Sequence, residues 1–239
     1  MEGSKLPSIK WILAMYLITH KKGISSVQLS KDIGVQQRTA WFILHRIRES
    51  LSNDTPEERM DGIVEIDECF VGGRNKNRHY NRRMKYKADI GRTWPDKAPV
   101  FGMYERSTGR IRAEALDSKT FVNIGLAIVR NIHIGATLMT DDWDGYIRIE
   151  GLYERKTIDH RKKIYADGEI TTNRVENFWS HFKRGLHGTY IRVTPKHLNK
   201  YVQEFVFRAN NRNLGVKQQI DTIIKNMNCR LKYKQLIAK

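Results

Sequence analysis

Apolar residues recur at helical spacing along the first part of the chain. They lie three or four positions apart from residue 7 to residue 20, which predicts a helix there. Two more helical segments follow, SVQLSKDI and QQRTAWFILHRIRES, and Gly34 separates them. A short helix, a glycine-containing turn and a longer basic helix are typical of a helix-turn-helix. We therefore expect a helix-turn-helix domain over residues 1–52.

After this domain, the pattern changes to apolar runs of strand length. The polar segment 53–61 contains Pro56 and is expected to be a linker. The following runs predict strands at 63–71, 98–106, 110–117, 137–142 and 153–159, and helices at 120–131, 172–187 and 195–211. Three successive strands, followed by helices interspersed with strands, favour an α/β fold with a ribonuclease-H-like mixed sheet flanked by helices. We expect this domain over residues 62–212 and a basic C-terminal helix at 213–239.

The charge balance restricts the kind of partner. The chain of 239 residues carries 43 Lys and Arg against 26 Asp and Glu, a formal net charge of +17. Such a charge favours a polyanion, because phosphate contacts supply most non-specific affinity for nucleic acids. No apolar stretch approaches the roughly 20 residues of a membrane span and no signal peptide opens the chain, so we expect a cytoplasmic protein without a membrane partner. The two distant cysteines, Cys69 and Cys229, argue against a disulfide scaffold and a zinc ribbon.

Two regions place basic and amide side chains where DNA contacts are expected. The second helix of the helix-turn-helix presents four side chains that suit base edges in the major groove: Gln36, Gln37, Arg38 and Thr39. Between the first two predicted strands lies a long basic insertion, which includes Arg74 and Lys76. It is too polar for a core and too long for a hairpin turn, so we expect a DNA-contacting loop. The alternatives are a helical bundle without a DNA role and a merely solvated loop.

The first predicted strand carries an acid in its middle. Period-two alternation in this strand puts Glu65, Asp67 and Cys69 on one face and leaves Glu68 on the other. An acid within a buried strand is costly unless it is paired or bound to a metal. Asp67 is therefore a better metal-ligand candidate than Glu68, which lies near the strand end. Glu65 is the local rival, and a structural salt bridge is the alternative role for Asp67.

Three acids follow the apolar run ATLMT. Asp141 is the first of them, at the point where the predicted strand reaches its carboxyl end. Ligand sites of open α/β sheets gather at that end. Asp142 is expected to point to the opposite side, and Asp144, next to Gly145, suits a turn or a helix N-cap. Asp141 is therefore the favoured ligand in this segment.

The helix predicted at 172–187 has one apolar stripe and a polar flank. The stripe consists of Val175, Phe178, Trp179, Phe182 and Leu186. Glu176 and Lys183 lie on the same flank of that stripe, two turns apart. If the stripe packs on the sheet, Glu176 is held at the sheet edge and Lys183 is placed to contact a phosphate. Asn173, one turn before Glu176, is the alternative oxygen ligand, and an exposed Glu–Lys surface is the non-functional explanation.

Asp67, Asp141 and Glu176 together supply two strand carboxylates and one helix carboxylate. Such a set can hold two Mg²⁺ ions about 3.5–4 Å apart, which stabilises both the attacking and the leaving oxygen of a phosphodiester displacement. Mn²⁺ is the other ion expected. In a chain of net charge +17, this set points to metal-dependent chemistry on nucleic acid.

The spacing of these acids and the residues around them resemble the DDE transposases of bacterial insertion sequences. The resemblance is closest to the fifteen-ninety-five family, which has the ISXO-two-like transposase domain. The segments that carry it are SSVQLSKDIGVQQRTAWFILHRIR, VEIDECFVGGRNKN, MTDDWDGY, TTNRVENFWSHFKRGLHGTY and TPKHLNKYVQEFVFRANNR. The last two segments in tandem are its most specific part.

The resemblance implies that Asp67, Asp141 and Glu176 form a metal-binding catalytic triad and that Lys183 contacts DNA. Arg184, beside that lysine, is expected to neutralise phosphates. The implied activity is cleavage of DNA at the element ends and strand transfer into target DNA, with two Mg²⁺ or Mn²⁺ ions as cofactors. The expected setting is nucleoid DNA in the bacterial cytoplasm, with the protein acting as a homodimer or higher oligomer. Family members with Asn or His as the third ligand keep Asn173 as an alternative.

Two other functions fit the same residues. One is a metal-dependent nuclease that cuts DNA without strand transfer, and it would use the same acids. The other is a helix-turn-helix regulator whose acid-bearing domain is catalytically inactive. Cleavage that depends on Mg²⁺ or Mn²⁺ would argue against the regulator. Joined DNA strands would argue against the nuclease.

Overall fold

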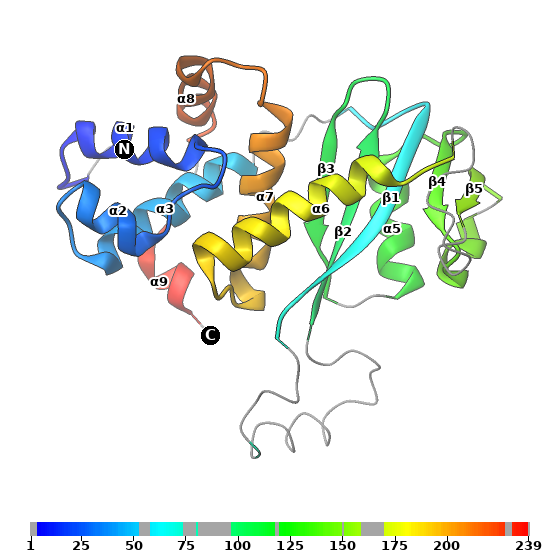
Figure 1. The fold of residues 1–239 in the computed structure, drawn as a ribbon, viewed down its shortest axis with the longest axis horizontal. Helices are drawn as coiled ribbons and strands as arrows, with labels where there is room; N and C mark the ends of the chain where they lie inside the picture. The colour runs from blue at the N-terminus through cyan, green and yellow to red at the C-terminus, as the bar shows by residue number, and fades with distance from the viewer. Residues whose placement is uncertain are drawn as a thin grey trace. The chain divides into compact units, whose positions relative to one another are not determined.

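A computed structural model describes residues 4–52, 58–73, 80, 97–117, 120–149, 151–158, 170–227 and 231–238, and Figure 1 shows its elements. The chain divides into two compact units. The first, here called the helical unit, comprises Met1–Glu58, Gly109–Arg112 and Asn177–Lys239. The second, here called the sheet unit, comprises Arg59–Thr108 and Ala113–Glu176. None of the helices in the described part of the chain is long and apolar enough to cross a membrane.

Among the described residues, the sheet has five strands in the order β3-β2-β1-β4-β5. Their bounds are β1 Ile63–Val71, β2 Ala98–Glu105, β3 Ile111–Ala115, β4 Thr137–Asp141 and β5 Glu154–Ile158. The central strand β1 runs antiparallel to β2 and parallel to β4, and β4 runs parallel to β5. The result is a mixed, ribonuclease-H-like sheet, which confirms the predicted fold class. Each strand boundary lies within two residues of the range expected from the apolar runs.

One face of the sheet is covered by α5, Phe121–Asn131 (Figure 1). The helix begins at Thr120, whose hydroxyl accepts a hydrogen bond from the Asn123 N–H, a common N-cap arrangement. Val64 and Ile66 of β1 are fully buried in the same apolar cluster as residues of α5. Alternation along β1 therefore sends its even-numbered side chains toward α5 and its odd-numbered side chains to the other face.

The helical unit joins both ends of the sequence in one core. Its helices are α1 Ser8–Thr19, α2 Ser26–Asp32, α3 Gln37–Leu51, α7 Pro195–Asn210, α8 Val216–Lys225, α9 Tyr233–Ile237 and most of α6 Asn173–Gly185. The buried apolar side chains of α1 to α3 share one cluster with Phe207 of α7 and Ile223 of α8. The division between the units thus falls inside the expected 62–212 domain. The segment 213–239 was expected as one basic helix, and its described residues form two, α8 and α9.

A buried ionic network holds α3 and α7 together. The Arg48 guanidinium donates through Nε to Glu204 Oε2 at 2.6 Å, and both side chains are essentially inaccessible to solvent. Arg208 and the Tyr190 hydroxyl contact the other oxygen of the Glu204 carboxylate. Burial alone would raise the pKa of Glu204, but the positive charges of Arg208 and Arg48 hold it below its ordinary value. Removing one member of such a network leaves a buried charge without its partner, which costs about 3–5 kcal/mol.

Gly23 lies directly against this network. Its φ of +66° belongs to the left-handed region that favours glycine. A Cβ atom at this position would lie 2.6 Å from Arg208 Nη1 and 2.7 Å from Glu204 Oε1, and it would also overlap the Tyr190 hydroxyl. Both the backbone conformation and the neighbouring atoms therefore require glycine.

We predict that Gly23→Ala destabilises the helical unit much more than Gly34→Ala. Gly34 has a similar φ of +61°, but its nearest neighbour would be Lys10 Nζ at 3.9 Å. Gly34→Ala should cost about 1–2 kcal/mol of unfolding free energy from the backbone alone. Gly23→Ala adds the cost of overpacking, for a total of about 2–5 kcal/mol. Chemical denaturation followed by circular dichroism measures both losses, and equal losses would contradict the role assigned to the network.

Candidate functional site

The parallel pairing of β1 and β4 brings two aspartates side by side. Val64 pairs with Leu138 and Glu65 with Met139. Two residues further along both strands, this register sets Asp67 beside Asp141, at the carboxyl end of β4. The sequence placed both residues on apolar strands, but only the pairing of the strands makes them neighbours.

A third carboxylate joins the two aspartates. Asp67, Glu68 and Asp141 each place an oxygen within 4.8 Å of one another, and all three side chains are half-buried. Glu68 also accepts a hydrogen bond of 2.6 Å from the hydroxyl of Tyr146, which belongs to the apolar cluster on the α5 face. Glu68 therefore leaves β1 on the α5 face, as the alternation predicts. Its carboxylate nevertheless belongs to the acidic cluster. Its position beside Asp67 was the available signal, because a glutamate side chain is long enough to reach around the edge of a strand.

Glu65, the rival of Asp67, anchors the start of α6. Its carboxylate is fully buried and accepts hydrogen bonds from the N–H groups of Arg174 and Val175, at 2.9 and 3.3 Å. Arg106 donates to its other oxygen at 2.8 Å. A carboxylate at a helix N-terminus is stabilised by the unpaired amides and by the helix dipole. Glu65 thus sets the first turn of α6 on the face of β1 that also carries Asp67.

The first turn of α6 places Glu176 near Asp67, but its carboxylate is not part of the group formed by Asp67, Glu68 and Asp141. Its side chain is half-buried, and its Oε1 accepts a hydrogen bond of 3.2 Å from the Thr172 hydroxyl. Asn173, the alternative third ligand, is exposed. Glu176 belongs to the sheet unit together with Asp67 and Asp141, and its charge is close enough to affect the ionisation of Asp67.

The ionisation of Asp67 reflects this concentration of negative charge. Burial raises the pKa of Asp67 from its ordinary 3.8 to about 7, with further contributions from the charges of Glu68, Asp141 and Glu176. A hydrogen bond from the backbone of Glu68 opposes the rise. Carboxylates that repel one another in this way are favourable ligands for a divalent cation, which would compensate their charge. The all-oxygen set of donors suits Mg²⁺ and Mn²⁺.

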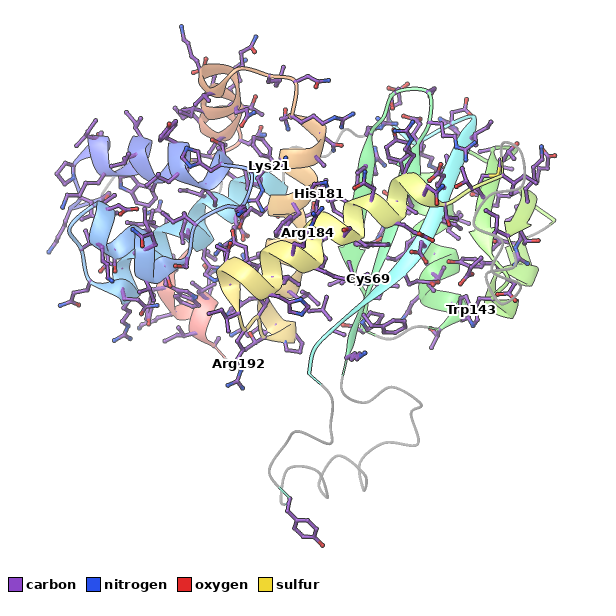
Figure 2. All side chains as sticks on the ribbon, viewed as in Figure 1. Lys21, Cys69, Trp143, His181, Arg184 and Arg192 are labelled. Atoms are coloured by element: carbon purple, nitrogen blue, oxygen red, sulfur yellow. The ribbon has the colours of Figure 1, made fainter. Side chains whose placement is uncertain are left out.

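The end of β4 is held in place by its own hydrogen bonds. The Asp141 carboxylate accepts from the Trp143 N–H at 3.2 Å, and the guanidinium of Arg155 donates to the carbonyl of Asp141 at 3.0 Å. Trp143 is half-buried just beyond the strand and is labelled in Figure 2. One oxygen of the Asp141 carboxylate is therefore bound to the backbone of the turn that follows β4. This contact gives the carboxylate a defined orientation at the carboxyl end of the strand.

The DNA-contact candidates on α6 are both exposed. Lys183 and Arg184 lie in the part of α6 that belongs to the helical unit. Arg184 donates through Nε to the Ser180 carbonyl at 3.2 Å, and its Nη2 lies 3.4 Å from His181 Nδ1. Arg74 and Lys76, the candidates in the basic insertion, lie outside the described residues.

The candidates at the start of α3 differ in how free they are to reach a partner. Gln36, Gln37 and Arg38 are exposed and Thr39 is half-buried. Gln37 donates to the Ser26 hydroxyl of α2 at 2.7 Å. The Arg38 guanidinium donates to the Tyr233 hydroxyl of α9 at 2.5 Å and lies 4.8 Å from the centre of that ring. The short helix α9 therefore contacts the end of α3 that was expected to read DNA.

We predict that Asp67→Asn stabilises the protein in EDTA, and more so at higher pH. The native state binds the Asp67 proton more tightly than the unfolded chain, because the folded pKa of about 7 exceeds the ordinary value of 3.8. The native state of the unsubstituted protein therefore loses stability as the pH rises through this interval, and the asparagine variant does not. Melting temperatures of both proteins at about pH 5 and about pH 7.5 test this. A difference between them that is independent of pH would contradict it.

Two comparisons with known proteins agree with this geometry. Residues 59–210, which include Asp67, Asp141 and Glu176, match the ISXO2-like transposase domain. The chain is also 27% identical over 230 residues to the "Uncharacterized protein in transposable element ISH50" of Halobacterium salinarum, an alignment that covers 94% of this chain and 77% of that protein. The match confirms the resemblance seen in the sequence segments. Because the matched region spans more than half of the sequence, the chain belongs to the ISXO2-like transposase family.

Proposed function

We propose that this protein is a DNA transposase that cuts and joins phosphodiesters with two divalent metal ions held by Asp67, Asp141 and Glu176. The observation that carries the proposal is that Asp67, in the middle of β1, and Asp141, at the end of the parallel strand β4, lie in one acidic cluster, and that Glu176, on a helix anchored on the same face of β1, is close enough to affect the ionisation of Asp67. Family membership supplies the substrate class, which is DNA. We extend the proposal to a homodimer or higher oligomer on DNA, because an element has two ends to process.

Some residues of the proposed site would bind the ions, and others orient the residues that do so. Asp67, Asp141 and Glu176 would hold the ions, and Glu65 orients the turn of α6 that carries Glu176. The ions, when bound, supply stabilisation of the attacking and leaving oxygens. Water attacks the phosphorus at the element end, the P–O3′ bond breaks and a free 3′-hydroxyl results. That hydroxyl then attacks a phosphodiester of target DNA in the same manner, so no covalent bond to the protein is needed.

Glu68 is a further participant in the proposed site. Its carboxylate lies within the acidic cluster, and Tyr146 orients it by donating a hydrogen bond. Burial, followed by the charge of Glu68 and this hydrogen bond, raises the pKa of the Tyr146 hydroxyl well above its ordinary value. The tyrosine therefore keeps its proton and acts as a hydrogen-bond donor. We propose that the pair positions a fourth carboxylate beside the metal-binding acids.

We predict that Asp67→Asn, Asp141→Asn and Glu176→Gln each lower cleavage of DNA by about a thousandfold or more, since a metal site contributes several kcal/mol to such reactions. Asn173→Ala should retain measurable activity. Glu154→Gln is the matched control, because it removes an exposed carboxylate from the neighbouring strand β5. Cleavage of labelled duplexes in Mg²⁺ or Mn²⁺ measures the effect. Full activity of the Asp67→Asn or Asp141→Asn variant would overturn the assignment of the site.

The products of the same assay separate the three candidate functions. Substrates are taken from the DNA on both sides of the reading frame, with an unrelated duplex as target. Joined strands support a transposase, whereas cut strands without joining would indicate a nuclease. Specific binding without any cleavage in either metal would indicate a regulator.

We predict different effects for Arg38→Ala and Lys183→Ala on DNA binding. Deleting the N-terminal helices is unsuitable as a test, because their apolar side chains share a core with Phe207 and Ile223. Arg38→Ala should relax sequence preference, at a cost of about 1–3 kcal/mol for the preferred site. Lys183→Ala should weaken binding to all sequences and reduce the salt slope by about 1. Fluorescence anisotropy at several salt concentrations tests both, and an unchanged preference in Arg38→Ala would give α3 a structural role only.

A further inference from the structure

The chain adopts a strained turn just after α6. The helix widens into a π-helix, Leu186–Tyr190, and the Ile191 N–H donates to the Leu186 carbonyl at 2.7 Å. Ile191 has φ +58° and ψ −52°, and the Arg192 N–H donates back to the Tyr190 carbonyl at 2.5 Å. This is a γ-turn of the rare kind with positive φ, which is strained even for small residues. Ile191 is the one positive-φ residue other than glycine in the described part of the chain.

Ile191 is also highly exposed. Its side chain is 82% accessible, more than any other large apolar residue that the structure describes. A β-branched residue in this conformation costs free energy through backbone strain. Because its side chain is exposed, it gains no free energy from apolar burial in return. Asparagine or glycine would satisfy the turn at lower cost. Strain of this kind persists where the surroundings over-determine the conformation, and such positions cluster at functional sites.

The turn is rigidly supported from beneath. The ring of Tyr190 packs edge-on against Tyr201, with 4.9 Å between ring centres, and its hydroxyl contacts Glu204 of the buried ionic network. The Thr189 hydroxyl donates to the Lys22 carbonyl at 3.1 Å. The residues before Ile191 are thus tied to the core and to the turn between α1 and α2. Ile191 is therefore presented outward on a fixed support.

The surface around this support is basic. Lys22 and Arg192 are both exposed, and the described residues place no ion pair on either of them. Further along, burial and then the charges of Arg184 and Lys21 lower the pKa of His181, so these cations gather at one place on the helical unit. Figure 2 labels these last three residues. An exposed apolar side chain with Arg192 next to it in the chain and Lys22 on the adjoining turn is complementary to DNA, which has phosphates outside and apolar base faces inside.

We propose that the turn 186–192 is a wedge that distorts duplex DNA, with Ile191 inserted at a base step and Arg192 and Lys22 on the flanking phosphates. Apolar side chains that partly unstack a step are a general means of bending DNA. The wedge rests on the proposed function for its ligand, which is DNA, but it does not depend on the acidic site or on metal ions. A local opening of the duplex would help to place a particular phosphodiester for reaction.

The test measures affinity in EDTA for two duplexes of the same sequence, one perfectly paired and one with a central mismatch. A mismatch lowers the energy needed to unstack a step, so the protein should prefer the mismatched duplex by about tenfold or more. Ile191→Ala and Ile191→Gly should bring this ratio close to one. Ile9→Ala is the matched control, because Ile9 is 67% exposed in the regular helix α1, and it should keep the full ratio.

Two further measurements make the outcome decisive. Ile191→Gly should melt at the same temperature as the unsubstituted protein or higher, since glycine relieves the strain of the turn. Arg192→Ala should weaken binding of both duplexes equally, as expected for a phosphate contact. The wedge is refuted if the unsubstituted protein shows no mismatch preference, or if both Ile191 variants retain it.

The same variants also separate this proposal from its alternatives. Binding to phosphatidylglycerol vesicles that depends on Ile191, without a mismatch effect, would assign the turn to an anionic lipid surface and overturn the wedge. Because the duplex measurements are made without metal, loss of cleavage in the acidic-site variants leaves the mismatch ratio unchanged. Failure of the catalytic proposal and failure of the wedge are therefore distinguishable.

Discussion

The buried carboxylate of Glu65 is the interaction on which the candidate site depends. It joins the central strand to the first turn of α6 through two backbone amides, and Arg106 balances its charge. Because Glu65 and Asp67 share a face of β1, the same anchor that begins the helix also sets Glu176 near Asp67. A glutamate whose role is structural therefore determines the geometry of residues whose proposed role is chemical.

Glu65 is paired with Arg106 and with backbone amides, whereas the carboxylates of the acidic cluster repel one another. Asp67 is half-buried beside other carboxylates, and its pKa rises to about 7 because burial and repulsion both disfavour the charged form. Such an arrangement contributes nothing to the stability of the metal-free fold. A protein keeps a cluster of this kind where a cation or a reaction uses it, which is the same argument that applies to the strained and exposed Ile191.

Much of the fold could be predicted from the chain alone, because local patterns determine it. Apolar runs of strand length located the five strands of the described residues within two positions, and the helical stripe located α6. The same patterns placed Asp67 in mid-strand and Asp141 at a strand end. They did not reveal Glu68, since alternation predicts which face a side chain leaves but not how far a long side chain reaches at a strand edge.

The sequence by itself determined most of the elements, the α/β class and the family, because these depend on periodicity and on short motifs. Tertiary structure decided which acids meet, since the register of β1 against β4 and the Glu65 anchor join residues that are distant in the chain. It also decided that α7 and α8 share a core with α1 to α3 and that α9 contacts Arg38. Long-range packing of this kind arises from shape and burial across the whole molecule, and no local pattern in the sequence records it.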